Sequence, residues 1–208
     1  MGLLCLLLGA AIGIGCWNLA AVLTEGRKDS ASDEILSVPV GSADHERLAE
    51  LAFAAAACLQ TGDYEKLGAY THPVYGLIFS PTATVTLSTN RCLTAARTAC
   101  LDRDETVYIW GVVTGSDEPI QLTPAQYVAA YVYDRDYRSA PILSFDTPAR
   151  TGNALENTAA VFPEAHYVDL CFPASEAGGL DWSILRMVFE EYDGEFRLTA
   201  LIHSTYSE

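Results

Sequence analysis

The chain begins with an almost uninterrupted run of apolar residues. Between positions 3 and 23 the only polar side chain is Asn18. A run of this length is about what an α-helix needs to cross the hydrocarbon core of a bilayer. It predicts that residues 1–23 attach the chain to a cell membrane, with the rest of the protein held outside the cytoplasm.

Two interpretations of this anchor are open. In the first, the segment is a signal peptide cleaved before Cys16, whose thiol then receives lipid. Gly15 and Cys16 match the end of a bacterial lipobox, although Gly13 stands where Leu is usual and no Lys or Arg follows Met1. In the second, the whole stretch is an uncleaved transmembrane helix. Residues 24–43 are polar and charged with little apolar periodicity, which predicts a flexible linker.

After the linker, the spacing of apolar residues becomes helical. Leu48, Leu51, Ala52, Ala55 and Leu59 lie on one helix face. Ser42 or Asp44 can cap this helix, and Gly62 ends it. Asp63 can then cap a second helix that runs to Tyr70 and is broken by His72 and Pro73.

The remaining pattern predicts mainly strands. They cover residues 74–79, 85–87, 106–114, 141–145, 166–172, 182–192 and 195–203. Short helices are predicted at 93–100 and at 123–133, where Thr123 and Gln126 can form a capping box. Residues 147–164 are predicted to be mostly loop. Helices followed by strands indicate an α+β domain over residues 44–208.

The last two strands flank Asp193-Gly194, the preferred pair for a two-residue type I′ turn. That turn places Tyr192 opposite Glu195, and a regular register then places Glu190 opposite Arg197. One face is predicted to be apolar and to comprise Leu185, Met187, Phe189, Leu198, Ala200 and Ile202. The other face is predicted to carry Arg186, Glu190 and His203.

The composition of the chain excludes one class of partner. Lys and Arg total 12 against 27 Asp and Glu, a formal net charge of -15. A nucleic acid is therefore not an expected partner, because binding phosphate requires a basic surface. The hydrophobic fraction of 50% is ample for a packed core.

Motifs that carry known chemistry do not occur. The chain has no G-x-S-x-G, no P-loop and no C-x-x-C, and we predict neither a metal nor a cofactor. The candidate binding residues are His203, Arg186, Glu190 and His72. Of the cysteines in the domain, Cys92 and Cys100 could form a disulfide across the short helix, whereas Cys58 and Cys171 are predicted to be buried thiols.

Several sequence stretches carry a resemblance. Thr61-Gly62-Asp63-Tyr64 between two helices, then His72-Pro73, resembles the nuclear transport factor 2-like fold. More specific stretches are similar to an uncharacterised family of bacterial surface lipoprotein domains, and they span most of residues 44–208. They are His72-Pro73-x-x-Gly76-x-x-Phe79-Ser80-Pro81, Tyr108-x-Trp110-Gly111, Glu118-Pro119-Ile120-x-Leu122-Thr123 and Asp181-Trp182-x-x-Leu185-Arg186-x-x-Phe189-Glu190.

The resemblance implies N-terminal helices packed on a curved, mainly antiparallel sheet in a cone-like domain, with membrane attachment outside the cytoplasm. It implies no established activity. The chain departs from the family in its lipobox and in the segment from Cys92 to Cys100.

Two classes of function follow from these observations. The first is a non-enzymatic module that binds a peptide, a cell-wall fragment or a small molecule in the mouth of the cone. The second is an enzyme that uses His203 or His72 together with a carboxylate in a pocket.

The two interpretations of the anchor predict different masses. If Cys16 is lipidated, Cys16→Ala should abolish processing and leave a heavier, unlipidated precursor. If residues 1–23 form a transmembrane helix, the substitution should change neither processing nor location. Intact-mass measurement of the wild-type protein from membranes separates them, because a mass equal to the full translated chain contradicts lipidation.

Overall fold

The computed structural model describes residues 43–113, 116, 118–150 and 155–206, in which the first two helices precede the strands. The helices are α1 (Ala43–Thr61), α2 (Tyr64–Tyr70), α3 (Ala95–Thr98), α4 (Pro124–Tyr131) and α5 (Thr158–Val161), with a 3-10 turn at Tyr137–Ser139. The strands are β1 (Leu77–Ser80), β2 (Arg91–Leu93), β3 (Tyr108–Val112), β4 (Pro119–Leu122), β5 (Ile142–Phe145), β6 (His166–Phe172), β7 (Ser183–Tyr192) and β8 (Glu195–Thr205). The predicted α+β class is confirmed.

The predicted anchor at 1–23, with Cys16, lies outside the described residues, as does nearly all of the predicted linker. Within the part of the chain that the structure describes, no helix combines the length and the apolar character needed to cross a bilayer.

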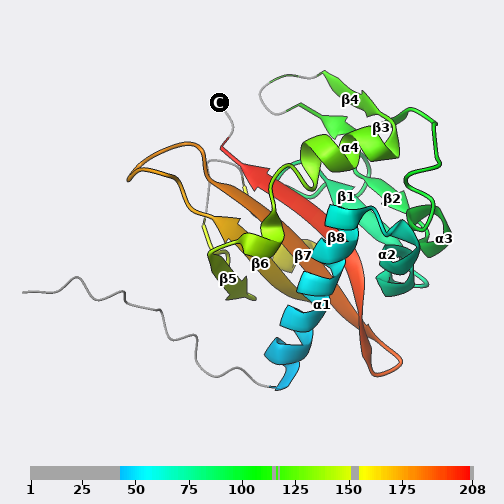
Figure 1. Cartoon of the computed structure of the whole chain (residues 1–208), viewed down its shortest axis with the longest axis horizontal. Helices are drawn as coiled ribbons and strands as arrows, with labels where there is room; N and C mark the ends of the chain where they lie inside the picture. The colour runs from blue at the N-terminus through cyan, green and yellow to red at the C-terminus, as the bar shows by residue number, and fades with distance from the viewer. Residues whose placement is uncertain (1–42, 114–115, 117, 151–154, 207–208) are drawn as a thin grey trace, which may run out of the picture. The chain divides into compact units, whose positions relative to one another are not determined.

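Strand β8 lies inside a six-stranded sheet of order β2-β1-β8-β7-β6-β5. It pairs in parallel with β1 and antiparallel with β7, and the other neighbouring pairs are antiparallel. The curved sheet carries α1 across one face, while β3 and β4 form a separate two-stranded ribbon near α4 (Figure 1). The mainly antiparallel, curved sheet with N-terminal helices matches the prediction.

The helix starts follow the signals in the sequence. Asp63 Oδ1 accepts a hydrogen bond from the backbone N–H of Lys66, 3.2 Å away, and so caps α2. At α4, the Thr123 hydroxyl accepts from the N–H of Gln126, whose Oε1 accepts from the N–H of Thr123 at 3.0 Å. This is the predicted capping box, with Pro124 in the first turn.

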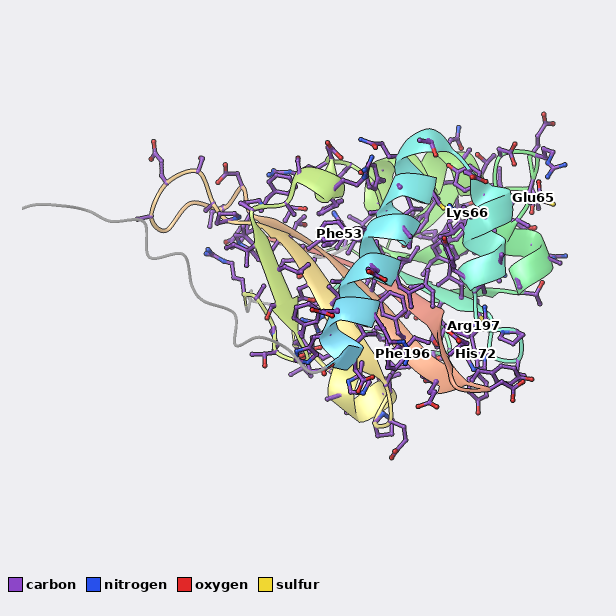
Figure 2. All side chains as sticks on the ribbon, turned by 60° about the horizontal axis from the view of Figure 1, so that its bottom comes forward. Phe53, Glu65, Lys66, His72, Phe196 and Arg197 are labelled. Carbon is purple, nitrogen blue, oxygen red and sulfur yellow. The ribbon has the colours of Figure 1, made fainter. Side chains whose placement is uncertain are left out.

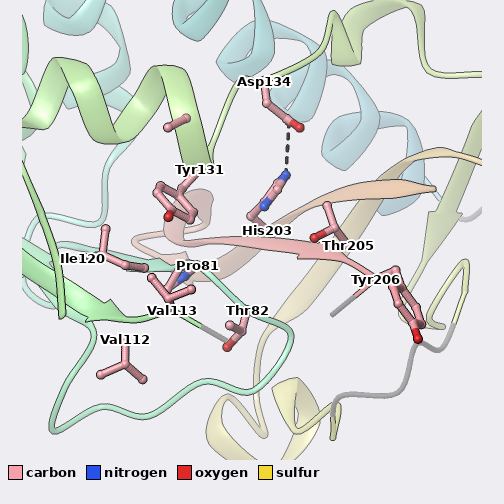
Figure 3. A pocket seen from close by; sticks show the side chains of 11 residues that line it. Pro81, Thr82, Val112, Val113, Ile120, Tyr131, Asp134, His203, Thr205 and Tyr206 are labelled. Atoms are coloured by element: carbon pink, nitrogen blue, oxygen red, sulfur yellow. Dashed lines mark hydrogen bonds and ion pairs between the residues drawn. The ribbon is translucent and has the colours of Figure 1, made fainter. Parts of the chain in front are cut away.

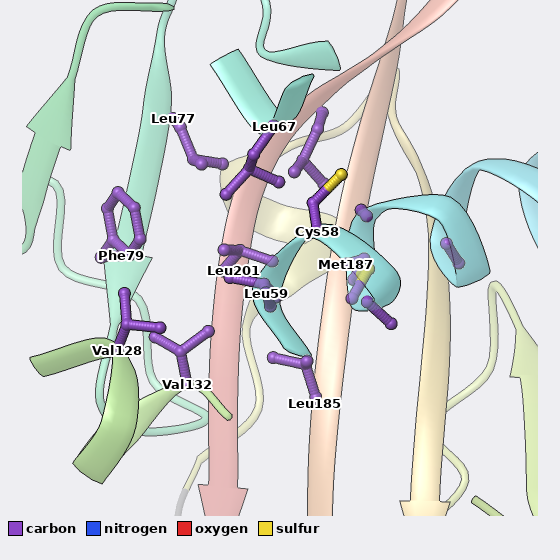
Figure 4. Packing of buried hydrophobic residues seen from close by; sticks show 14 of the residues in the cluster. Cys58, Leu59, Leu67, Leu77, Phe79, Val128, Val132, Leu185, Met187 and Leu201 are labelled. Atoms are coloured by element: carbon purple, nitrogen blue, oxygen red, sulfur yellow. The ribbon is translucent and has the colours of Figure 1, made fainter. Parts of the chain in front are cut away.

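The sheet separates two apolar layers. On the helix side, Leu185, Met187 and Leu201 are buried against α1 residues such as Leu59 (Figure 4). On the opposite side, a smaller layer is built by Val85, Phe162, Tyr167, Val188, Ala200 and Ile202. Both faces of the central strands are therefore covered, which explains why β7 and β8 are buried over most of their length.

The register of β7 and β8 follows the prediction near the turn and departs from it further along. Tyr192 pairs with Glu195, as the turn requires, and the register continues to the pair of Phe189 and Leu198. Val188 then pairs with Ala200, so Thr199 is the extra residue of a β-bulge. A shift of one residue exchanges the two faces of a strand. Every predicted position beyond Thr199 is therefore on the wrong face.

This shift corrects two predictions. Ala200 and Ile202 pack with Val188 in the smaller layer, where they had been predicted to face the main core. His203 pairs with Leu185, where Ile184 had been predicted, and therefore does not share a face with Arg186.

Further local predictions are wrong. Residues 85–87 form no strand, because the Asn157 side chain takes both backbone groups of Val85: its Oδ1 accepts from the N–H at 2.8 Å and its Nδ2 donates to the carbonyl at 2.9 Å. The edge strand of this region is β2, which the pattern did not indicate. Strand β4 was missed as well, and α5 lies within the segment 147–164 that was predicted to be mostly loop.

The cysteines of the described region are all free thiols. The candidate disulfide between Cys92 and Cys100 is therefore absent from the structure. The exposed Cys92 thiol instead donates to the carbonyl of Tyr75 at 3.2 Å. Cys58 and Cys171 are buried, as predicted.

The turn between β7 and β8 gives a stability prediction. Asp193 and Gly194 have φ values of 53° and 77°, as a type I′ turn requires. A Cβ at Gly194 would meet no atom within 4 Å, so the cost of Gly194→Val is backbone strain alone. We expect a loss of about 1–2 kcal/mol. This corresponds to a Tm lower by about 2–8 °C in thermal unfolding followed by circular dichroism.

Gly194→Asn is the matched control, because Asn tolerates the left-handed conformation better than Val does. It should lower the Tm less than Gly194→Val. Equal Tm values for Gly194→Val and wild type would contradict the turn and the register built on it.

Candidate functional site

A cavity of about 410 Å³ lies where the β3–β4 ribbon, the end of α4 and the end of β8 meet. The side chains around it are shown in Figure 3. Its lining residues are Pro81, Thr82, Val112, Val113, Ile120, Ala130, Tyr131, Asp134, His203, Thr205 and Tyr206. Apolar and polar side chains contribute about equally to its walls.

His203 is the candidate residue that the structure places in this cavity. The bulge at Thr199 turns its side chain to the helix side of the sheet, where its Nε2 lies 3.1 Å from Oδ1 of Asp134 (Figure 3). The His203 side chain is 7% exposed and that of Asp134 is 28% exposed. The pair is therefore largely buried, with the carboxylate more open than the ring.

Two hydroxyl groups hold Asp134 in place. Tyr137 donates its hydroxyl proton to the same Oδ1 at 2.8 Å, and the Tyr137 oxygen is also hydrogen-bonded to the hydroxyl of Ser183. Because Tyr137 donates to the carboxylate, Ser183 must donate to Tyr137. A chain of hydrogen bonds thus runs from Ser183 through Tyr137 and Asp134 to His203.

These contacts determine the charge of Asp134. Burial by itself would raise the pKa of this carboxyl, but the hydrogen bonds from His203 and Tyr137 outweigh it and lower the pKa below its ordinary value. Asp134 is therefore ionised at neutral pH.

The ionised carboxylate also determines the tautomer of the histidine. A carboxylate only accepts hydrogen bonds, so Nε2 of His203 carries the proton. In the neutral ring Nδ1 then has a free lone pair, and Figure 3 shows that nitrogen turned away from Asp134. No residue in the described part of the chain hydrogen-bonds to it. It can accept a hydrogen bond from a ligand or take a proton from one.

Arg186 lies on the other side of the sheet and is fully engaged. Its Nε and Nη2 donate to the two carboxylate oxygens of Asp169, at 2.6 Å and 2.9 Å. Its Nη1 donates to Glu156 and, at 2.8 Å, to the hydroxyl of Thr158. The guanidinium lies 4.2 Å from the ring centroid of Tyr167. Arg186 thus holds the 156–158 segment to the sheet, and each of its guanidinium nitrogens already donates within the protein.

His72 also has a structural role. Its Nδ1 accepts from the backbone N–H groups of Val74 and Tyr75, at 3.2 Å and 2.9 Å, and its ring stacks on Tyr75. Burial, and then the nearby positive charge of Arg197, lower its pKa (Figure 2). His72 is therefore a neutral residue that shapes the turn before β1.

Glu190 is half-buried and lies away from the cavity. It is opposite Arg197 in the ladder, as predicted, but these two described residues form no ion pair. Arg197 instead donates to the backbone carbonyl of Ala69 at 3.2 Å. Burial raises the pKa of Glu190.

The structure therefore brings none of His203, Arg186, Glu190 and His72 together. His203 pairs with Asp134 and shares the cavity with Tyr131, and the sequence singled out neither of these two. Asp134 is 69 residues away in sequence, and no motif links the two. In the sequence, Asp134 and Asp136 follow the tyrosine-rich end of α4, and this pattern alone does not indicate a site.

Comparisons with known proteins add little to this geometry. No protein family and no curated protein matches the chain. A solved structure described as a proposed calcium/calmodulin dependent protein kinase II association domain from Xanthomonas campestris is similar over 82% of this chain and 92% of its own, with 15% identity and a TM-score of 0.35. We draw no conclusion from a similarity of that size, and the lipoprotein family resemblance stays a prediction.

The Arg186 cluster gives a second stability prediction. Asp169 is completely buried, so Arg186→Leu leaves a carboxylate without its partner. We expect this variant to lose about 3–5 kcal/mol of unfolding free energy in urea unfolding. The double variant Arg186→Leu with Asp169→Leu should regain a large part of the loss, because no buried charge is then unpaired. Unfolding midpoints equal to wild type in the single variant would show that the pair does not stabilise the fold.

Proposed function

We propose that this protein is a membrane-anchored, extracytoplasmic module that binds a ligand in the cavity at His203. The observation that carries the proposal is the His203–Asp134 pair, which lies in a cavity lined by polar and apolar side chains and keeps one carboxylate oxygen without a partner among the described residues.

The size and lining of the cavity support binding. Its volume of about 410 Å³ is within the range of sites for small organic molecules, about 300–1,000 Å³. Val112, Val113 and Ile120 offer an apolar wall, and Tyr131 adds an aromatic ring. The hydrogen bonds from Tyr137 keep the polar group at one end fixed before a ligand arrives.

The other candidate residues have fewer free hydrogen-bonding groups for a ligand. Arg186 is already paired with two carboxylates, and His72 accepts two backbone hydrogen bonds. A buried group whose hydrogen bonds are satisfied within the protein gains little from a ligand. The free acceptor on His203 therefore favours the cavity as the binding site.

The anchor gives this module its location. Residues 1–23 attach it to the membrane, and the domain faces the outside, where a peptide, a cell-wall fragment or a small molecule can reach the cavity. The net charge of -15 keeps such a domain soluble and away from anionic lipid.

A second candidate function is an enzyme in which His203 acts as a general base. It is favoured by the same pair, because a carboxylate that fixes the tautomer of a histidine also stabilises the imidazolium formed on proton transfer. Its distinguishing property is turnover: a bound compound should be converted by wild type and bound without conversion by His203→Gln.

The binding proposal is tested with methyl NMR spectra of the full-length chain in lipid nanodiscs. Fragments from a small-molecule library should shift the methyl signals of Val112, Val113 and Ile120. His203→Gln should weaken the binding of the hits by about threefold to tenfold, as expected for one lost hydrogen bond.

His166→Gln is the matched control, because His166 forms the same kind of pair with Asp146, at 2.7 Å, but does not line the cavity. Its fragment affinities should equal those of wild type. Hits that lose affinity equally in both variants, or a library without any hit at these methyl groups, would contradict the proposed site.

A further inference from the structure

We propose that the ligand of this cavity carries an organic ammonium group on an apolar body. This inference rests on the proposed function, since it names the chemical class that the cavity at His203 selects.

The polar end of the cavity offers acceptors. The Nε2 of His203 donates to Asp134, so in the neutral ring Nδ1 has a lone pair. Asp134 uses Oδ1 for both His203 and Tyr137, and within the described residues Oδ2 receives no hydrogen bond. Because Nδ1 is turned away from Asp134, a single ligand nitrogen cannot bond to both atoms. The free oxygen Oδ2 of Asp134 is the acceptor for the ammonium group.

The charges around the cavity favour a cation. Asp134 is ionised, and no Lys or Arg is among the described residues that line the cavity. Charge-assisted hydrogen bonds to a partly buried carboxylate are stronger than neutral ones. An ammonium ligand would supply the cation that this carboxylate lacks.

The walls suit the rest of such a ligand. Tyr131 stacks on Tyr127 with ring centroids 5.4 Å apart and also lines the cavity, so it adds an aromatic surface that attracts a cation. Val112, Val113 and Ile120 can cover an apolar body. The net charge of -15 further raises the local concentration of organic cations.

An anionic ligand is disfavoured by the same groups. A carboxylate at the polar end would face the negative charge of Asp134, with no Lys or Arg among the described lining residues to compensate it. An uncharged alcohol can donate one hydrogen bond but gains no charge interaction. The expected order of affinity is therefore ammonium, then alcohol, then carboxylate.

Three probes that share a phenyl ring test this order: 2-phenylethylamine, 2-phenylethanol and phenylacetate. Each is titrated into the full-length chain in lipid nanodiscs, with the methyl signals of Val112, Val113 and Ile120 as the measurement. We expect 2-phenylethylamine to bind at least tenfold more tightly than phenylacetate.

The variant Asp134→Asn tests whether the charge of Asp134 causes the preference for an ammonium ligand. The amide oxygen can keep the hydrogen bonds from His203 and Tyr137, so the variant removes mainly the charge. We expect the affinity for 2-phenylethylamine to fall at least fivefold and that for 2-phenylethanol to change less than twofold. Glu164→Gln removes one exposed charge outside the cavity and is the matched control for net charge, with no change expected.

The outcomes separate the two proposals. The ammonium class is wrong if phenylacetate binds as tightly as 2-phenylethylamine at these methyl groups. It is also wrong if Asp134→Asn weakens the binding of 2-phenylethylamine and of 2-phenylethanol equally. In either case the cavity remains a binding site. If none of the probes shifts these signals in folded wild-type protein, both the ammonium class and the proposed binding site are contradicted.

Discussion

The β-bulge at Thr199 determines which side chains of β8 belong to which layer of the domain. Before it, Phe196 and Leu198 face the helices; after it, Leu201 and His203 do. Without the extra residue, His203 would face the smaller layer and Ala200 would take a core position against α1. The cavity, the pair with Asp134 and the burial of Ile202 in the second layer all depend on this one inserted residue.

The cluster around Arg186 and the cluster around Asp134 lie on opposite sides of the sheet. They differ in how many of their hydrogen-bonding atoms lack a partner. Around Arg186, each of the three guanidinium nitrogens has an acceptor, and the cluster binds the 156–158 segment to β6 and β7. Around Asp134, the hydrogen bonds converge on a single oxygen, so one carboxylate oxygen and one imidazole nitrogen have no partner among the described residues. A satisfied cluster fixes structure, whereas an unsatisfied one at a cavity can bind.

Local signals in the sequence predicted the features that local chemistry determines. The caps at Asp63 and Thr123, and the turn at Asp193-Gly194, depend on residues within three positions of one another, and all three are confirmed. The bulge could not be predicted because its extra residue is a threonine, which is also a common strand residue. The pair of His203 and Asp134 could not be predicted either, since it forms only when α4 and β8 are brought together by the fold. Of the four candidate residues named from the sequence, only His203 lies in the cavity.

The sheet ends in two very short strands, β2 with three residues and β5 with four. An exposed sheet edge offers unpaired backbone groups to any neighbouring chain, and a short edge offers few of them. On the proposed membrane anchor, copies of the same chain would meet in two dimensions at high local concentration. The brevity of β2 and β5 would then act as protection against edge-to-edge self-association, allowing the domains to be crowded on a surface without joining their sheets.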